Sequence, residues 1–255
     1  MAGLFLDTES HTSRRRYAAR MKRRMRGITT AIAVALSVAG AAGWSLHSPE
    51  QPSVTAQSPA PQLGEFTDLI GKVSIVENLD SAPGYERGCG VDKRTGHKQG
   101  CVFGPAWNNP TSTTGCDTRN TVLAAQLQDV TFKPGTHNCK VVSGWLIDPY
   151  TGQRITLAQT QIDHVVPLHR AYDAGAWSWP AARRQQFAND PRNLLAVSAH
   201  ANQSKQDEGP GTWLPTNQSQ QCPYVVRYLS VSVAYQLPIT RSDKAAAAAA
   251  CGEQP

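Results

Sequence analysis

The adjacent residues Asp163 and His164, in the segment QIDHVVPL, carry the clearest chemical signal in the sequence. A histidine is the usual general base for hydrolysis near neutral pH, because its unperturbed pKa lies close to that pH. The neighbouring carboxylate can either orient the imidazole or bind a cation. An orienting role needs a nucleophile, and the chain has no GxSxG elbow and no free cysteine if all six cysteines are paired. The pair therefore favours a cation-assisted hydrolytic site with His164 as its base.

A second group of polar residues lies in the segment NLLAVSAHANQSKQD. Asn202 and Lys205 stand three residues apart on a predicted helix, so they share one face of it. The Asn202 amide oxygen offers a second ligand for a cation, and the Lys205 ammonium is free to meet a phosphate. Asp163 and His164 are consecutive in a predicted strand and would point to opposite faces. Both can serve one site only if the backbone turns there, as Pro167 indicates.

Several short segments follow one another along the chain in the order GCDTRN, DPYTG, DHVVPL, FANDP, NLLAV, NxxK and WLP. Together they resemble the exported bacterial HNH-type (ββα-metal, His-Me finger) endonucleases over roughly residues 85–251. They are also similar to the C-terminal nuclease domain of GmrSD-like modification-dependent restriction enzymes. The stretch between Tyr85 and FGPAW contains Cys89 and Cys101, which do not belong to that pattern. We interpret this stretch as a disulfide-stapled insertion.

The resemblance implies a role for each residue of the two groups. His164 would activate water, while Asp163 and Asn202 would bind one Mg²⁺ or Mn²⁺. Asn193 would brace the loop that positions the base, and Lys205 would contact a phosphate. Carboxylate and amide oxygens suit these hard cations better than zinc. The implied reaction is one-metal hydrolysis of phosphodiester bonds, with DNA as the expected substrate and RNA as the other nucleic acid that the same residues could serve.

Some assignments stay open on the sequence alone. Arg119 in GCDTRN is either a partner in a salt bridge at the start of a helix or a clamp on a substrate phosphate. His169 and His200 are expected on helix surfaces. Two other functions compete with the nuclease: an extracytoplasmic binding module on a degenerate nuclease scaffold, and a phosphodiesterase that acts on something other than nucleic acid.

The elements that must position these residues follow from periodicity and turn signals. Apolar spacing predicts a helix over residues 118–130, with Asp117 or Thr118 as its N-cap, and the DPYTG turn predicts a hairpin formed by residues 140–147 and 153–157. Further expected elements are a strand ending in QIDH, a helical region over 168–189 broken at Pro180, a strand at 194–198, a polar helix at 199–207, and closing helices at 222–236 and 240–251. The sequence thus predicts an α+β fold with little regular sheet, in which helices pack around a short hairpin and a ββα-metal core.

The net charge of +6 does not by itself indicate a nucleic-acid-binding domain. Residues 1–27 contain eight of the 25 Lys and Arg residues and two of the 19 acidic ones. The remaining 17 basic and 17 acidic residues balance. A nucleic-acid function must therefore rest on a site and not on bulk charge.

The basic arm precedes an apolar segment at residues 28–46, an order typical of an export signal. The small residues AGA at 39–41 favour cleavage, although the segment is also long enough to anchor the chain in a membrane. Residues 47–64 are rich in Pro, Ser and Gln and predict a linker. The expected organisation is an arm with signal peptide or anchor at 1–46, a linker at 47–64 and a nuclease domain at 65–255, secreted or displayed outside the cytoplasm.

The six cysteines fit such an oxidising compartment. Proximity in the sequence favours the pairs Cys89 with Cys101, Cys116 with Cys139, and Cys222 with Cys251. No CxxC pair occurs, so a structural zinc site is the weaker interpretation.

Overall fold

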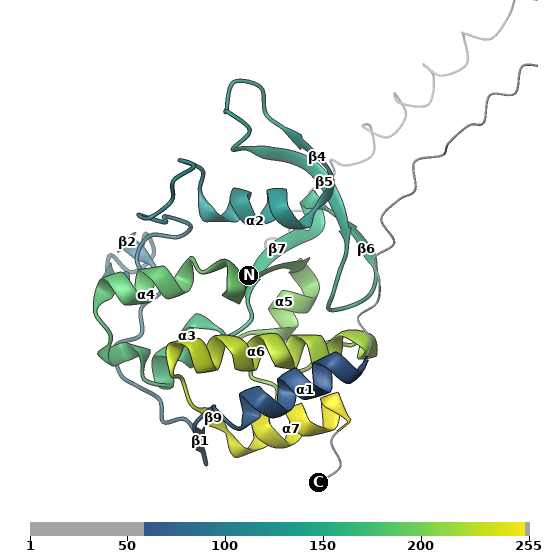
Figure 1. The fold of residues 1–255 in the computed structure, drawn as a ribbon. Helices are drawn as coiled ribbons and strands as arrows, with labels where there is room; N and C mark the ends of the chain where they lie inside the picture. Colours follow the sequence, from purple (N-terminus) through teal and green to yellow (C-terminus); the bar gives the residue numbers. More distant parts are fainter. Residues whose placement is uncertain (1–58, 253–255) are drawn as a thin grey trace, which may run out of the picture. The chain divides into compact units, whose positions relative to one another are not determined.

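A computed structural model describes residues 59–252 of the protein (Figure 1). The predicted basic arm, the apolar segment 28–46 and most of the predicted linker lie outside these residues. Within residues 59–252, none of the helices combines the length and apolarity that a membrane crossing requires.

The described chain forms a mixed α+β domain. Its helices are α1 Pro59–Ile70, α2 Thr118–Gln126, α3 Leu168–Asp173, α4 Ala181–Ala188, α5 Ala199–Lys205, α6 Gln221–Tyr235 and α7 Arg241–Cys251, with short 3₁₀ turns between some of them. Its strands are β1 Ile75–Val76, β2 Cys89–Val91, β3 Lys98–Gly100, β4 Gln128–Phe132, β5 Val141–Ile147, β6 Arg154–Thr156, β7 Thr160–His164, β8 Leu194–Ser198 and β9 Ile239–Thr240. The α+β class with little regular sheet, predicted from the sequence, is confirmed.

The strands form small separate sheets. Strands β4, β5 and β6 make an antiparallel sheet in that order, and β2 pairs with β3. Strands β7 and β8 form an antiparallel pair whose register runs from Thr160 opposite Ser198 to His164 opposite Leu194. Helix α5 begins immediately after β8, whereas α3 and α4 lie between β7 and β8 in the sequence, so two paired antiparallel strands and a helix come together around Asp163 and His164.

The predicted helix over 118–130 is correct at its start and too long at its end. The Asp117 side chain accepts a hydrogen bond from the Asn120 amide and caps α2 as expected. The helix ends at Gln126, because the following residues pair with β5 as strand β4. Backbone pairing across the sheet here overrides the helical spacing of the apolar residues.

The composition predicts that the linker ends at residue 64 and that the domain begins at residue 65. Helix α1 begins earlier, at Pro59. Residues 59–64 belong to the same helix as Phe66, which is fully buried. Proline is tolerated in a first helical turn, because the amides there have no intrahelical acceptor, so Pro59 and Pro61 do not prevent this helix. Packing of α1 on α6 and α7 supplies the stabilisation that the linker-like composition did not reveal.

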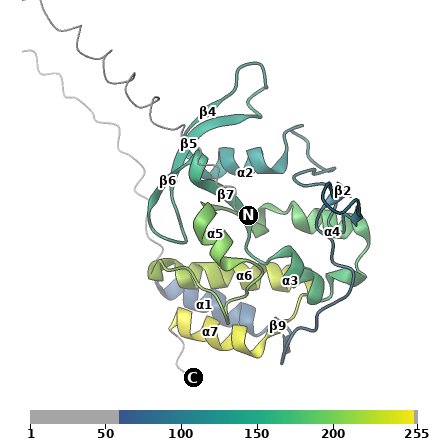
Figure 2. The same ribbon diagram turned by 180° about the vertical axis from the view of Figure 1, so that it is seen from behind.

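Two hydrophobic clusters lie on either side of the β7–β8 pair. One cluster gathers α1, α3, α4, α6 and α7 and includes Phe66, Val165 and Leu229. The other lies under α2 and β5 and includes Leu123 and Leu194. Figures 1 and 2 show α1, α6 and α7 together at one end, the β4–β5 hairpin at the other, and β7 and α5 between them. The strand pair that carries Asp163 and His164 is therefore held by packing on both faces.

The three disulfides pair as sequence proximity favoured: Cys89–Cys101, Cys116–Cys139 and Cys222–Cys251. The first closes the β2–β3 hairpin, the second joins the residues before α2 to the β4–β5 loop, and the third joins the first turn of α6 to the end of α7. All six cysteines lie in the described part of the chain and none of them is free. The zinc interpretation therefore has no thiolates to use.

We predict that the Cys222→Ser/Cys251→Ser variant unfolds more easily than the wild type. This disulfide closes a loop of 29 residues, and removing it should lower the free energy of unfolding by about 3–4 kcal/mol, because the unfolded chain gains conformational freedom. Chemical denaturation measures the effect. An unchanged unfolding midpoint in the double variant would contradict this role of the third disulfide.

Candidate active site

The imidazole of His164 is oriented by a backbone carbonyl. Its Nε2 lies 2.9 Å from the Ala188 oxygen at the end of α4. A carbonyl can only accept a hydrogen bond, so Nε2 carries the proton and Nδ1 keeps its lone pair in the neutral ring. The Trp107 ring lies parallel to the imidazole, at 7° between planes and 5.9 Å between centroids. His164 is thus held as a neutral ring with one nitrogen available to accept a proton.

The electrostatic surroundings favour the neutral form of His164. Burial lowers the pKa of His164 to about 4, and the positive charges of Arg87 and Lys205 act in the same direction. The hydrogen bond to Ala188 opposes this shift without reversing it. At neutral pH the ring is therefore in the state that a general base requires.

Asp163 points toward the interior and is only 4% exposed. Its Oδ2 accepts a hydrogen bond of 2.5 Å from the Tyr150 hydroxyl, and its Oδ1 accepts one of 3.1 Å from Lys205 Nζ. Burial disfavours both charged forms, so it raises the pKa of Asp163 and lowers the pKa of Lys205. The positive charge of Lys205 partly offsets the shift of Asp163, and the negative charge of Asp163 partly offsets the shift of Lys205. Each carboxylate oxygen retains a lone pair after these bonds.

Lys205 is not free to meet a phosphate, and the sequence-based expectation of such a contact is wrong on this point. The side chain is fully buried, and Nζ donates to Asp163 and, over 2.9 Å, to the backbone oxygen of His164. The face of α5 that carries Lys205 packs against β7. The long side chain therefore reaches inward to the strand instead of outward to solvent.

Asn202 lies on the same face of α5 and is half-buried. Its Nδ2 donates to Gln161 Oε1 over 2.9 Å, which fixes the orientation of the amide. No group of residues 59–252 donates a hydrogen bond to Asn202 Oδ1, so this oxygen is available as a ligand. Gln161, which orients Asn202, has no role in the sequence-based assignment.

Asn193 is fully buried beneath the turn that follows β7. Its Oδ1 accepts from the Val166 amide at 2.8 Å, its Nδ2 donates to the Val166 oxygen at 3.1 Å, and its own carbonyl accepts from the Val165 amide at 2.9 Å. These bonds tie the turn to the start of β8 immediately beyond His164. This is a bracing geometry, and the contribution of Asn193 to catalysis stays a prediction.

A small cavity of about 190 Å³ brings several of these residues together. Asp163, His164 and Asn202 line it, so the two consecutive strand residues face one cavity at the place where β7 ends. The complete lining is Tyr85, Arg87, Ile162, Asp163, His164, Pro167, Leu168, Asn202, Gln206 and Asp207. Tyr85 and Arg87 were missed by the sequence reasoning, and the only signal for them is their position just before Cys89.

The remaining candidates from the sequence, Arg119, His200 and His169, are not among the residues that line the cavity. Arg119 is half-buried on α2, does not line the cavity, and forms no ion pair within residues 59–252. His200 is exposed on α5. His169 is held at the rim, where it stacks on Tyr85 at 4.2 Å and lies 3.0 Å from Asp207 Oδ2.

The donor set around the cavity fits one hard cation held by few protein ligands. Over residues 59–252 there is no cluster of three or more His, Cys, Asp or Glu side chains of the kind that encloses a metal. Asp163 keeps one lone pair on each oxygen and Asn202 Oδ1 is unpaired, and both line the same cavity. Two oxygen ligands would leave room for water and substrate, the arrangement that suits Mg²⁺ or Mn²⁺.

Comparisons with known proteins found one matching family and one similar protein. The family of GmrSD restriction endonucleases, C-terminal domain, matches residues 117–249. An uncharacterised secreted protein of the fungus Arthroderma benhamiae is 41% identical over 145 residues, which cover 56% of this chain and 69% of that protein. No solved structure matches the chain. The chain belongs to the family of GmrSD restriction endonuclease C-terminal domains.

We predict that Lys205→Met destabilises the fold. It leaves the Asp163 carboxylate buried without a counter-charge, which typically costs about 3–5 kcal/mol. Chemical denaturation should show this loss, whereas Lys244→Met, which removes an exposed lysine of α7, should unfold like the wild type. A Lys205→Met protein of wild-type stability and reduced activity would instead support the phosphate contact expected from the sequence.

Proposed function

We propose that this protein is an exported, divalent-cation-dependent endonuclease that hydrolyses phosphodiester bonds of DNA or RNA. The observation that carries the proposal is the position of His164. Its Nε2 is committed to the Ala188 carbonyl, its Nδ1 has no hydrogen-bond partner within residues 59–252, and it shares one cavity with the oxygen donors of Asp163 and Asn202. Membership of a restriction endonuclease family supports phosphodiester chemistry at this site.

The fold around the site supports the same interpretation. We regard β7, β8 and α5 as the ββα-metal core that the sequence resemblance implies, because β7 pairs antiparallel with β8, and β8 leads directly into the helix that carries Asn202. Three disulfides and a relative described as secreted support a location outside the cytoplasm. Cleavage or anchoring of residues 28–46 stays a prediction.

The reaction follows from the protonation state of the base. His164 Nδ1 accepts a proton from the attacking water as its oxygen bonds to phosphorus. The ester bond on the opposite side of phosphorus breaks, and its oxygen leaves with the bonding pair and takes a proton from solvent. Asp163 and Asn202 would hold the Mg²⁺ or Mn²⁺, which when bound would neutralise negative charge on the phosphate. Asn193 and Ala188 keep the imidazole in place throughout.

We predict that His164→Ala abolishes most cleavage and preserves substrate binding. Loss of a general base typically lowers the rate by about 10²- to 10⁴-fold, while binding rests on other residues. Plasmid nicking measures the rate, and fluorescence anisotropy with labelled DNA measures binding. His200→Ala, an exposed substitution on α5, is the matched control and should cut normally.

Three outcomes would contradict the proposed base or the proposed function. Wild-type cleavage by His164→Ala would move the base to another residue. DNA binding without any cleavage by the wild type, in magnesium or manganese, would favour a binding module on a degenerate nuclease scaffold. Cleavage of a simple phosphodiester such as bis(p-nitrophenyl) phosphate, with no action on DNA or RNA, would favour the phosphodiesterase with another substrate.

We also predict that activity needs Mg²⁺ or Mn²⁺ and that Asn202→Ala weakens the binding of this cation. The substitution removes one of two protein oxygens, so the metal concentration for half-maximal nicking should rise. Gln203→Ala, an exposed change one residue along α5, should leave that midpoint unchanged. Full activity in excess chelator would rule out the cation, and an unchanged midpoint in Asn202→Ala would remove Asn202 from its ligands.

A further inference from the structure

Arg87 lies in the wall of the same cavity as His164, Asp163 and Asn202. It is half-buried, and no carboxylate of residues 59–252 forms an ion pair with it. Of its guanidinium donors, NH1 bonds the Gly104 carbonyl at 3.2 Å. A guanidinium has five N–H groups, so residues 59–252 leave most of the hydrogen-bonding capacity of Arg87 unused.

The charges around the cavity leave the positive charge of Arg87 uncompensated. Asp163 is already paired with Lys205, and Asp207 is bonded to His169 at the rim. The Arg87 charge is close enough to lower the pKa of His164. An unpaired, partly desolvated guanidinium beside a base is suited to a phosphate group, which it can bind through two parallel hydrogen bonds.

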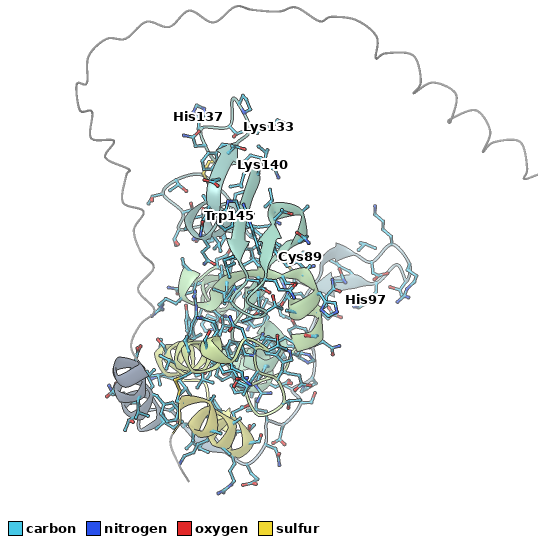
Figure 3. All side chains as sticks on the ribbon, turned by 90° about the vertical axis from the view of Figure 1, so that its right-hand side faces the viewer. Cys89, His97, Lys133, His137, Lys140 and Trp145 are labelled. Atoms are coloured by element: carbon cyan, nitrogen blue, oxygen red, sulfur yellow. A yellow bond between two sulfur atoms is a disulfide. The ribbon has the colours of Figure 1, made fainter. Side chains whose placement is uncertain are left out.

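The backbone on both sides of Arg87 is fixed by the disulfide-closed hairpin. The Glu86 oxygen accepts from the Val102 amide at 3.0 Å, and the Gly88 oxygen accepts from the Cys101 amide at 2.9 Å. The Cys89–Cys101 disulfide holds the two chains at a Cα–Cα distance of 4.4 Å. From α4, Arg184 Nε donates to the Val102 oxygen at 2.5 Å and ties this segment to the domain. Figure 3 shows the hairpin, with Cys89 and His97 labelled, projecting from the body of the domain.

We propose that Arg87 binds a phosphate of the substrate next to the base, and that the Cys89–Cys101 disulfide positions it there. This proposal rests on the proposed nuclease function and adds a substrate contact to the same site. Arg87 precedes the region that matches the restriction endonuclease family, which begins at residue 117. The stapled insertion thus belongs to the binding site. Arg87 binds the phosphate that the sequence analysis expected Lys205, which is buried, to contact.

The test compares Arg87→Ala with Arg94→Ala, which removes the same charge from an exposed position on the same hairpin. In the His164→Ala background, Arg87→Ala should bind labelled DNA roughly 10- to 100-fold more weakly, the usual effect of losing a hydrogen bond to a charged group. Its affinity should also depend less on salt, with the logarithmic slope smaller by about one. With His164 intact, the change should raise KM, and Arg94→Ala should behave like its parent in each assay. Equal DNA affinity and equal salt slopes for both variants would overturn the proposal.

The disulfide is tested with Cys89→Ser/Cys101→Ser. Circular dichroism should show a folded protein, and DNA affinity should fall in the same direction as for Arg87→Ala. If Arg87→Ala is also introduced, little further loss is expected, because the guanidinium is already misplaced. Parent-like DNA affinity of the folded double-serine variant would overturn the positioning role of the disulfide.

A phosphate titration separates this proposal from the nuclease function. Inorganic phosphate added to the wild type should shift the NMR signal of the Arg87 Nε–H group, and Arg87→Lys should bind phosphate more weakly. A shift without any nucleic-acid cleavage would support the anion site and contradict the nuclease. Cleavage by the wild type with no shift and no effect of Arg87→Ala would overturn the inference and leave the nuclease standing. Neither cleavage nor a shift would overturn both.

Discussion

The buried ion pair between Asp163 and Lys205 is the interaction on which the geometry of the site depends. It joins β7 to α5, and the Tyr150 hydroxyl ties the turn between β5 and β6 to the same carboxylate. Lys205 also bonds the His164 carbonyl, so one ammonium holds the side chain of Asp163 and the backbone of His164. A buried ion pair adds little net stability over apolar packing, but a missing partner is costly. The pair therefore commits one face of α5 to β7 and places Asn202 beside Gln161.

Asp163 and His164 have different surroundings because consecutive side chains of a strand point to opposite faces. Asp163 points into the protein and is held by two donors, while His164 is directed to the end of α4 and stacks on Trp107. The turn after His164, braced by Asn193, lets both residues line one cavity. The carbonyl of Ala188 selects the tautomer, and burial keeps the ring neutral. The properties of the proposed base therefore come from backbone groups and packing as much as from the histidine itself.

Two of the three disulfides secure parts of the domain that have little core of their own. The residues of β2 and β3 are mostly exposed, and the β4–β5 hairpin projects with Lys133, His137 and Lys140 near its end (Figure 3). One covalent link closes the base of the β2–β3 hairpin, and another joins the β4–β5 loop to the residues before α2. Each link replaces some of the missing burial, because it limits the freedom of the unfolded chain. In the first hairpin this link also bears on the site, because Arg87 lies in the same segment.

Local signals in the sequence were enough for most elements and for singling out Asp163, His164 and Asn202, which the structure places in one cavity. The strand at 194–198, the helix after it and the Asp117 cap are encoded by neighbouring residues, and close spacing favoured the disulfide pairs now seen. Only the tertiary structure decided that residues 128–132 pair as a strand and that Lys205 turns inward to a carboxylate 42 residues away. It also decided that Arg87 lines the cavity and that Gln161 accepts a hydrogen bond from Asn202. The physical reason is that periodicity and caps act over a few residues, whereas the partner of a long polar side chain is chosen by elements that meet only in the folded protein.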